Sequence, residues 1–102
     1  GRKDNVINSG GVKIQIEEVE ALLKPMLTKP YIITKRNDTK FGEVVVLLTE
    51  NENITEVETI CKQILPKYWQ PKLIKQVASI PMTATGKPAR AQAFTIASNI
   101  EK

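Results

Sequence analysis

The sequence predicts an α+β fold, in which a small three-stranded, mainly antiparallel sheet is flanked by helices and preceded by an N-terminal β-hairpin. Three patterns indicate this class: β-branched apolar runs, apolar residues at helical spacing, and turn residues between the two. The 102 residues, 41% of them hydrophobic and 25% charged, have the size and composition of one ordinary globular domain.

A hairpin and a helix are expected first. Residues 5–8 and 12–14 are short extended segments joined by Ser9-Gly10-Gly11, and glycines between β-branched residues favour a tight turn because glycine reaches positive φ at little steric cost. A helix follows and weakens or ends around Pro25. Its apolar face contains Ile16, Val19, Leu22, Leu23 and Met26, and its other side carries Glu17, Glu18 and Glu20.

Three later segments are predicted strands, and a fourth is a terminal helix. The β-branched runs 31–36 and 43–49 are separated by turn residues and form an antiparallel pair. The second run is apolar almost throughout, which is typical of a central strand covered on both faces. A third strand is predicted around residues 73–78, and an Ala-rich helix over residues 89–99.

The middle helix is predicted from a capping box, formed by Thr55 and Glu58 three residues later. Cys61 falls on its apolar face, so we predict a small core residue rather than a nucleophile. Beyond this helix, Tyr68 and Trp69 beside lysines either stack on bases or pack over the edge of a core. Without a nucleic-acid motif in the chain, packing is favoured.

Composition argues against several classes of function. The net charge of +4 comes from Lys and Arg spread along the chain, without the dense basic stripe of a nucleic-acid binder. The chain has no histidine and a lone Cys61, which excludes His-based acid–base catalysis, a multi-cysteine metal site and an intrachain disulfide. It has no apolar run of membrane length and no signal-peptide pattern. We therefore expect a cytoplasmic protein with no metal site and no nucleic-acid or membrane partner.

A polar loop near the C-terminal end presents one lysine directly after a glycine. Pro81 and Pro88 fix φ on either side, so Lys87 is predicted at an exposed turn. Gly86-Lys87 does not form a phosphate-binding P-loop, because Pro81 stands where the leading glycine is required and Pro88 where the magnesium-binding Ser or Thr is required. Taken alone, Lys87 is a solvated cation.

Two motifs together resemble a known superfamily. Residues 1–14, followed by Glu18-Val19-Glu20, resemble the hinge motif of the adenylate-forming enzymes, which include acyl-CoA synthetases, luciferases and peptide-synthetase adenylation domains. That motif runs Gly-Arg-x-Asp, then Ile, Gly, another Ile, and Glu-Ile/Val-Glu. The closing motif of the superfamily, Pro-x-Thr-x-x-Gly-Lys-x-x-Arg, is matched by Pro81, Thr83, Gly86, Lys87 and Arg90, and an intermediate Lys-Tyr-Lys-x-Pro segment by Tyr68 and Pro71.

The resemblance implies a reaction and a catalytic residue. Members of the superfamily join a carboxylate to AMP, releasing pyrophosphate, and then usually pass the acyl group to the thiol of CoA or of a carrier protein. Lys87 matches the adenylation lysine, which reaches into the active site of a larger N-terminal domain. A compact ammonium beside the attacked phosphorus stabilises the transition state more than the ground state. Thr85, Gly86 and Arg90 are expected to support this loop.

The hinge motif implies a second set of roles. Asp4 matches the hinge about which the domain rotates between the two half-reactions, and Arg2 is expected near the ribose or the phosphates. Ser9, Gly10 and Gly11 would line the channel for the pantetheine arm. Glycines suit a channel because a thin acyl-carrying arm must pass close to backbone.

The resemblance covers residues 1–102, which look like a single C-terminal lid domain whose N-terminal adenylation domain is absent from the chain. ATP, CoA and a carboxylic acid are expected substrates, with Mg2+ bound through the N-terminal domain, no cofactor bound to this chain, and the isolated chain inactive. The Ser-Gly-Gly turn looks more like that of bacterial aryl- and o-succinylbenzoate-CoA ligases than that of luciferases or acetyl-CoA synthetases, which adds o-succinylbenzoate and menaquinone biosynthesis to the expectations. Two alternatives stay open: a peptide-synthetase adenylation subdomain acting on a carrier protein, and a non-catalytic anion-binding module.

Overall fold

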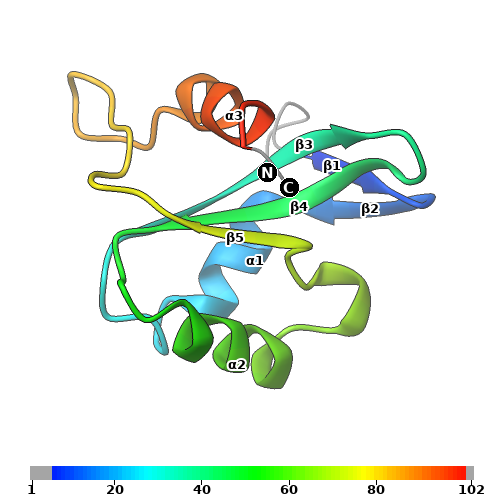
Figure 1. Cartoon of the computed structure of the whole chain (residues 1–102), viewed down its shortest axis with the longest axis horizontal. Helices are drawn as coiled ribbons and strands as arrows, with labels where there is room; N and C mark the ends of the chain where they lie inside the picture. Colours follow the sequence, from blue (N-terminus) through cyan, green and yellow to red (C-terminus); the bar gives the residue numbers. More distant parts are fainter. Residues whose placement is uncertain (1–5, 101–102) are drawn as a thin grey trace.

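The structure, a computed structural model, describes residues 6–100. In this range the chain forms a five-stranded sheet, with α1 and α2 covering one face and α3 the other (Figure 1). The predicted α+β class is therefore confirmed. The elements are β1 (Val6–Ser9), β2 (Val12–Gln15), α1 (Ile16–Leu23), β3 (Tyr31–Asp38), β4 (Gly42–Thr49), α2 (Ile54–Ile64), a short 3-10 helix (Lys67–Trp69), β5 (Leu73–Gln76) and α3 (Arg90–Ser98).

Strand β4 is the centre of the sheet. Along one side it pairs antiparallel with β3, from Gly42 opposite Asp38 to Thr49 opposite Tyr31. Its other side is shared, because β5 runs parallel to its second half and β1 meets its first residue, where Ser9 lies opposite Gly42. The prediction of three strands is wrong. The four-residue β5 covers only part of the eight-residue β4, and the hairpin occupies the edge that is left open.

Side chains alternate along β4 between two cores. Val45 and Leu47 pack against α1 and α2 on one face, and Val46 and Leu48 pack against α3 on the other. All four are exposed by 1% or less. The prediction of a central strand covered on both faces is confirmed.

Two details of the helices differ from the sequence predictions. Asn53 caps α2, since its side chain accepts a 3.1 Å hydrogen bond from the Glu56 N–H, and Thr55 lies inside the first turn instead of at the cap. Leu22 and Met26, predicted on the apolar face of α1, are 41% and 44% exposed. The sheet-facing stripe of this eight-residue helix is already filled by residues at positions i, i+3 and i+7.

Cys61 belongs to the core beneath α1 and α2. It is 1% exposed, and burial, followed by the charge of Glu58, raises the pKa of its thiol to about 11. The prediction that Cys61 is a core residue is confirmed. Trp69 packs against the same core, whereas Tyr68 is 68% exposed.

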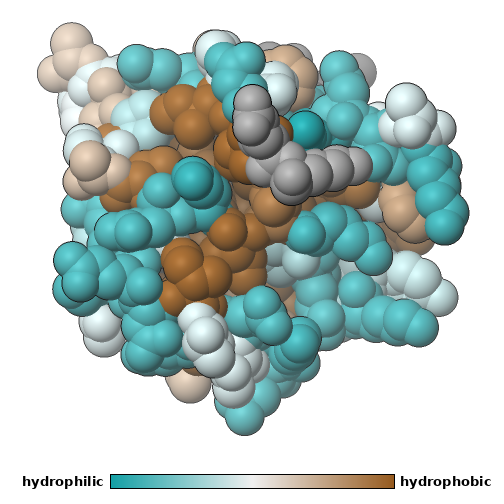
Figure 2. Space-filling model, viewed as in Figure 1, coloured by the Kyte–Doolittle hydropathy of each residue, from teal (hydrophilic) through white to brown (hydrophobic). Residues whose placement is uncertain are grey.

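Apolar side chains reach the surface in the middle of the face drawn in Figure 2 and are surrounded by hydrophilic ones. Partly buried apolar residues border the core under α3: Leu73, Val77, Ile96 and Ile100. Within residues 6–100, no helix has the length and apolar character needed to cross a bilayer. The same stretch contains no group of three or more Cys, Asp or Glu side chains arranged to hold a metal ion.

Candidate active-site turns

Lys87 lies on a tight turn between β5 and α3. The Thr83 N–H donates to the Lys87 carbonyl at 2.7 Å, and the Lys87 N–H donates to Thr83 Oγ1 at 3.2 Å. Gly86 has a φ of 82°, in the left-handed region that favours glycine, and the hydroxyls of Thr83 and Thr85 lie 3.0 Å apart. The predicted exposed turn is confirmed. Lys87 is exposed, and no ion pair holds its ammonium in the described part of the chain.

Both ends of the Lys87 turn are tied to the fold. Before it, the Ile80 N–H donates to Glu50 Oε2 at 2.9 Å. At its base, the Ala89 N–H donates to the Pro81 carbonyl at 3.0 Å. A hollow of about 620 Å³ lies between this base and α1. The turn therefore projects from a braced base, and residues 82–88 are all exposed.

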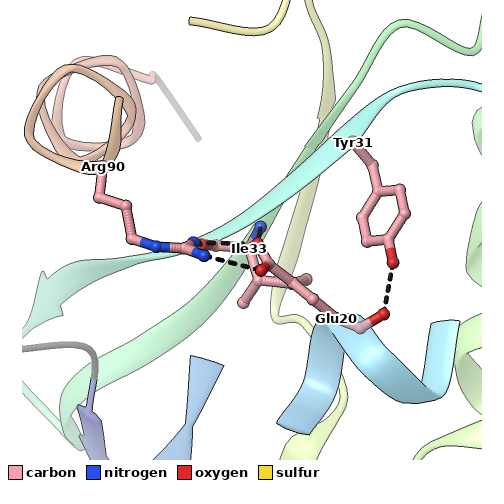
Figure 3. Close-up of polar contacts among 4 residues, drawn as sticks. All are labelled: Glu20, Tyr31, Ile33 and Arg90. Carbon is pink, nitrogen blue, oxygen red and sulfur yellow. Dashed lines mark hydrogen bonds and ion pairs between the residues drawn. The ribbon is translucent and has the colours of Figure 1, made fainter. Parts of the chain in front are cut away.

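Arg90, the first residue of α3, forms a two-pronged ion pair with Glu20 of α1. Arg90 Nη2 lies 2.8 Å from Glu20 Oε1, and Nη1 lies 3.0 Å from Oε2. The two side chains also bracket Ile33 of β3, because Oε2 accepts the Ile33 N–H at 3.0 Å and Nη1 donates to the Ile33 carbonyl at 3.4 Å (Figure 3). Hydrogen bonding to Glu20 raises the pKa of Arg90. The ion pair thus joins α3 to α1 around the free edge of β3.

Tyr31 of β3 is also bonded to helix α1. Its hydroxyl donates to the backbone carbonyl of Glu20 (Figure 3). Burial, and then the charge of Glu20, raises the pKa of Tyr31 to about 12, so the hydroxyl stays protonated and remains a donor at neutral pH.

Glu20 is the residue of this region that sequence reasoning missed. Its carboxylate was predicted on the outer side of the helix, yet it faces the sheet edge with its side chain only 20% exposed. The signal is in the spacing. Glu20 lies four residues after Ile16 and three before Leu23, both buried, so it borders the sheet-facing stripe.

The Ser9-Gly10-Gly11 turn joins β1 to β2, as predicted. Gly10 and Gly11 have φ values of 57° and 87°, and Ser9 lies opposite Val12. The Gly10 N–H donates to the Phe41 carbonyl at 2.9 Å, which fastens the turn to the loop before β4. A Cβ built on Gly11 would meet no atom within 4 Å, so this stretch of backbone is open to the surface.

A hollow of about 290 Å³ lies beside the glycine turn. Its lining is Ser9, Gly10, Val12, Phe41, Lys67, Tyr68 and Lys72. The ammonium groups of Lys40 and Lys72 each lie 5.3 Å from the centre of the Phe41 ring, within the range of a cation–π contact. The hollow combines bare glycine backbone, an aromatic ring and positive charge, a set that suits an anionic ligand.

The two turns lie at opposite ends of the molecule (Figure 1). The β1–β2 turn is at one end of the sheet, and the Lys87 turn, in the connection from β5 to α3, is at the other. The structure therefore does not bring Lys87 and Ser9-Gly10-Gly11 into one site. The predicted nucleotide-adjacent Arg2 and hinge Asp4 lie outside the described residues.

No family model matches the chain. The chain is 35% identical over 102 residues to the mitochondrial acyl-coenzyme A synthetase ACSM2B of Homo sapiens, an alignment that covers 88% of the chain and 18% of that protein. It is 33% identical over 92 residues to a ligase of Bacillus anthracis that acts on 3,4-dihydroxybenzoate and an aryl-carrier protein, covering 88% of the chain and 22% of the ligase.

A solved structure agrees with these relatives. An AMP-forming acyl-CoA synthetase/AMP-acid ligase II-like protein from Dyadobacter fermentans superposes with a TM-score of 0.76 and 31% identity, covering 96% of this chain and 31% of that one. The chain spans 22% or less of the length of the two curated relatives. Its homologues and structural neighbours are adenylate-forming enzymes of the AMP-binding, acyl-CoA synthetase family.

Proposed function

We propose that this chain is the C-terminal domain of an ATP-dependent acid–CoA ligase. Such an enzyme joins a carboxylate to AMP with release of pyrophosphate, and then transfers the acyl group to the thiol of CoA with release of AMP. The observation that carries the proposal is the Lys87 turn, an exposed lysine on a braced tip whose residues match the closing motif of the superfamily. The homologues support the same class of reaction.

In this proposal Lys87 is the catalytic residue of adenylation. Negative charge develops on the oxygens of the attacked phosphorus, and an ammonium placed beside them lowers the barrier. The hydrogen bonds between Lys87 and Thr83 hold the lysine backbone in place before the substrate arrives, so little reorganisation is left for the reaction itself.

The glycine turn serves the thioester half-reaction. Ser9, Gly10 and Gly11 line the path of the pantetheine arm, and the neighbouring Lys67 and Lys72 attract an acceptor that carries phosphate. The domain rotates about Asp4, so that it presents the Lys87 turn for adenylation and then the glycine turn for thioester formation. Arg2 lies near the ribose or the phosphates. The separation of the two turns in Figure 1 supports such alternation, since one fixed orientation would leave one turn remote from the reacting atoms.

The remaining parts come from the N-terminal adenylation domain of the same protein, the proposed partner of this chain. That domain supplies the phosphate loop, the acid pocket and the ligands of Mg2+. The isolated chain is therefore expected to catalyse no ATP–pyrophosphate exchange.

A carrier protein is the second candidate acceptor. The Bacillus anthracis relative, whose name includes an aryl-carrier protein, favours it, and the phosphopantetheine arm of a carrier has the chemistry of the CoA arm. The finer prediction of o-succinylbenzoate as the acid, and with it menaquinone biosynthesis, rests only on the Ser-Gly-Gly turn and is not supported by the names of the relatives. The cytoplasmic location also stays a prediction.

The experiment separates the half-reactions in the full-length protein that contains this chain. Acid-dependent ATP–pyrophosphate exchange is measured over a panel of carboxylic acids that includes o-succinylbenzoate and 3,4-dihydroxybenzoate. The acid that gives the fastest exchange is then used for the variants. Lys87→Ala should lower exchange by about 100-fold or more, while thioester formation from preformed acyl-adenylate stays within about twofold. The control is Lys75→Ala, at an exposed lysine of β5, which should change neither rate. Equal loss of both half-reactions in Lys87→Ala would contradict the assignment.

A further inference from the structure

The ion pair between Glu20 and Arg90 differs from an ordinary surface pair. Both carboxylate oxygens and two guanidinium nitrogens are used, and the side chains of Arg90 and Glu20 are only 25% and 20% exposed. By contrast, the Lys62–Glu58 pair on α2 has a single 3.0 Å contact between side chains that are 65% and 55% exposed. Fully exposed pairs contribute little, whereas bidentate Arg–carboxylate pairs add geometric specificity.

The pair also occupies the free edge of the sheet. Strand β3 pairs only with β4 in the described residues, so the backbone groups on its other side have no strand to bond. Glu20 accepts a hydrogen bond from the Ile33 N–H, and Arg90 donates one to the Ile33 carbonyl. Three elements are thereby fixed to one another at a single point: α1 on one face of the sheet, β3 at its edge and α3 on the other face (Figure 3).

Helix α3 has few other constraints at its start. Its N-cap residue, Ala89, forms no side-chain cap, and the buried residues of the helix are the small Ala93 and Ala97. The partly buried Ile96 packs against the same core, but it lies six residues after Arg90, so Ala93 is the buried side chain nearest the start of the helix. Arg90 is therefore the strongest polar tie at the first turn of α3.

Lys87 is separated from this tie by only two residues. Pro88 has a fixed φ, and Ala89 is hydrogen-bonded to the Pro81 carbonyl. On the other side of the turn, Glu50 holds the Ile80 N–H. Because only Pro88 and Ala89 lie between them, a displacement of the first turn of α3 would move the backbone of Lys87 as well.

We propose that Glu20 and Arg90 are positioning residues for adenylation: their ion pair around the edge of β3 fixes the start of α3 and thereby the place of Lys87. This inference rests on the proposed function of Lys87. Neither residue touches the substrate. They act by keeping the ammonium within reach of the transition state, where a displacement of an ångström has large kinetic consequences.

The test uses the full-length protein and both half-reactions. Arg90→Ala should lower kcat for adenylation about tenfold or more, with KM for ATP within about twofold, and Arg90→Lys, which keeps the charge but not the fork, should restore only part of the loss. Glu20→Gln, which keeps the shape of the side chain, should lower the same kcat several-fold. Thioester formation from preformed acyl-adenylate should stay near the wild-type rate in all three, which also shows that each variant is folded.

Matched variants make the outcome decisive. Glu58→Gln, in the exposed pair on α2, should leave both half-reactions unchanged. Adenylation within twofold of wild type in Arg90→Ala and Glu20→Gln would overturn the inference, and so would a parallel fall of both half-reactions, the signature of a purely structural role. Lys87→Ala is measured alongside. If it leaves adenylation intact, the proposed function itself fails. If it abolishes adenylation while Arg90→Ala and Glu20→Gln do not lower it, only the positioning role fails.

Discussion

The Lys87 turn and the glycine turn share a backbone device and differ in what they present. Gly86 and Gly11 have nearly the same φ, 82° and 87°, and an added Cβ would meet no atom within 4 Å at either position. The first turn carries a charged side chain to its tip and is braced by the carboxylates of Glu20 and Glu50. The second presents bare backbone beside cationic side chains.

The difference separates two kinds of functional element. A turn that delivers a group must fix the place of that group, so it is tied at both ends. A turn that lets a ligand pass must leave space, so it is made of glycine. The Gly10 N–H ties this turn to the Phe41 carbonyl, and Glu43 holds the Asn8 N–H just before it. If each turn serves one half-reaction, changes at one end should leave the other half-reaction intact.

The largest expected effect comes from blocking the exchange between the two ends. Asp4→Pro fixes φ at the proposed hinge and should trap one orientation of the domain. We expect thioester formation in the full-length protein to fall by about 100-fold while adenylation changes by less than about fivefold. Asp4→Ala, which removes the carboxylate without fixing φ, is the control and should retain most thioester activity. Unchanged thioester kinetics in Asp4→Pro would count against the hinge.

A smaller effect is expected from loosening the glycine turn. Glu43 Oε1 accepts the Asn8 N–H at 2.8 Å, and its Oε2 lies 3.0 Å from the Lys35 ammonium, which also donates to the Val6 carbonyl at 3.2 Å. Glu43→Ala removes this brace and should lower thioester formation about tenfold with adenylation unchanged, because a charged hydrogen bond contributes about 1.5–3 kcal/mol.

Glu58→Ala is the matched control for Glu43→Ala. Its i,i+4 pair with Lys62 is exposed and should contribute only about 0.3–0.5 kcal/mol, so neither half-reaction should change. A loss of adenylation in Glu43→Ala equal to the loss of thioester formation would show that Glu43 supports the whole domain rather than the glycine turn.

The sequence predicted local features well. The continuous apolar run of β4 predicted a strand buried on both faces, and the prolines and Gly86 predicted an exposed turn at Lys87, because each feature depends on residues adjacent in the chain. Helix boundaries were less certain. The sequence predicted Thr55 as the cap of the middle helix, and the structure uses Asn53, two residues earlier.

The sequence did not predict features that join distant segments. The place of the hairpin in the sheet depends on how much of β4 is left unpaired by β5. That depends on the length and register of β5 in the folded sheet. The pairing of Glu20 with Arg90 spans seventy positions in the chain, and a carboxylate on an amphipathic helix gives no sign of such a partner. Periodicity shows that Glu20 borders the buried stripe, but only the fold shows what faces it.

The most direct test of separate half-sites is one pair of matched substitutions, Gly86→Ala and Gly11→Ala, in the full-length protein. Each places a Cβ in open space at a positive φ, and each should cost about 1–2 kcal/mol of backbone strain. The ratio of adenylation rate to thioester rate is then measured for both. It should fall about fivefold in Gly86→Ala and rise about fivefold in Gly11→Ala. A ratio that moves in the same direction in both variants, or in neither, would contradict the assignment of one half-reaction to each end of the fold.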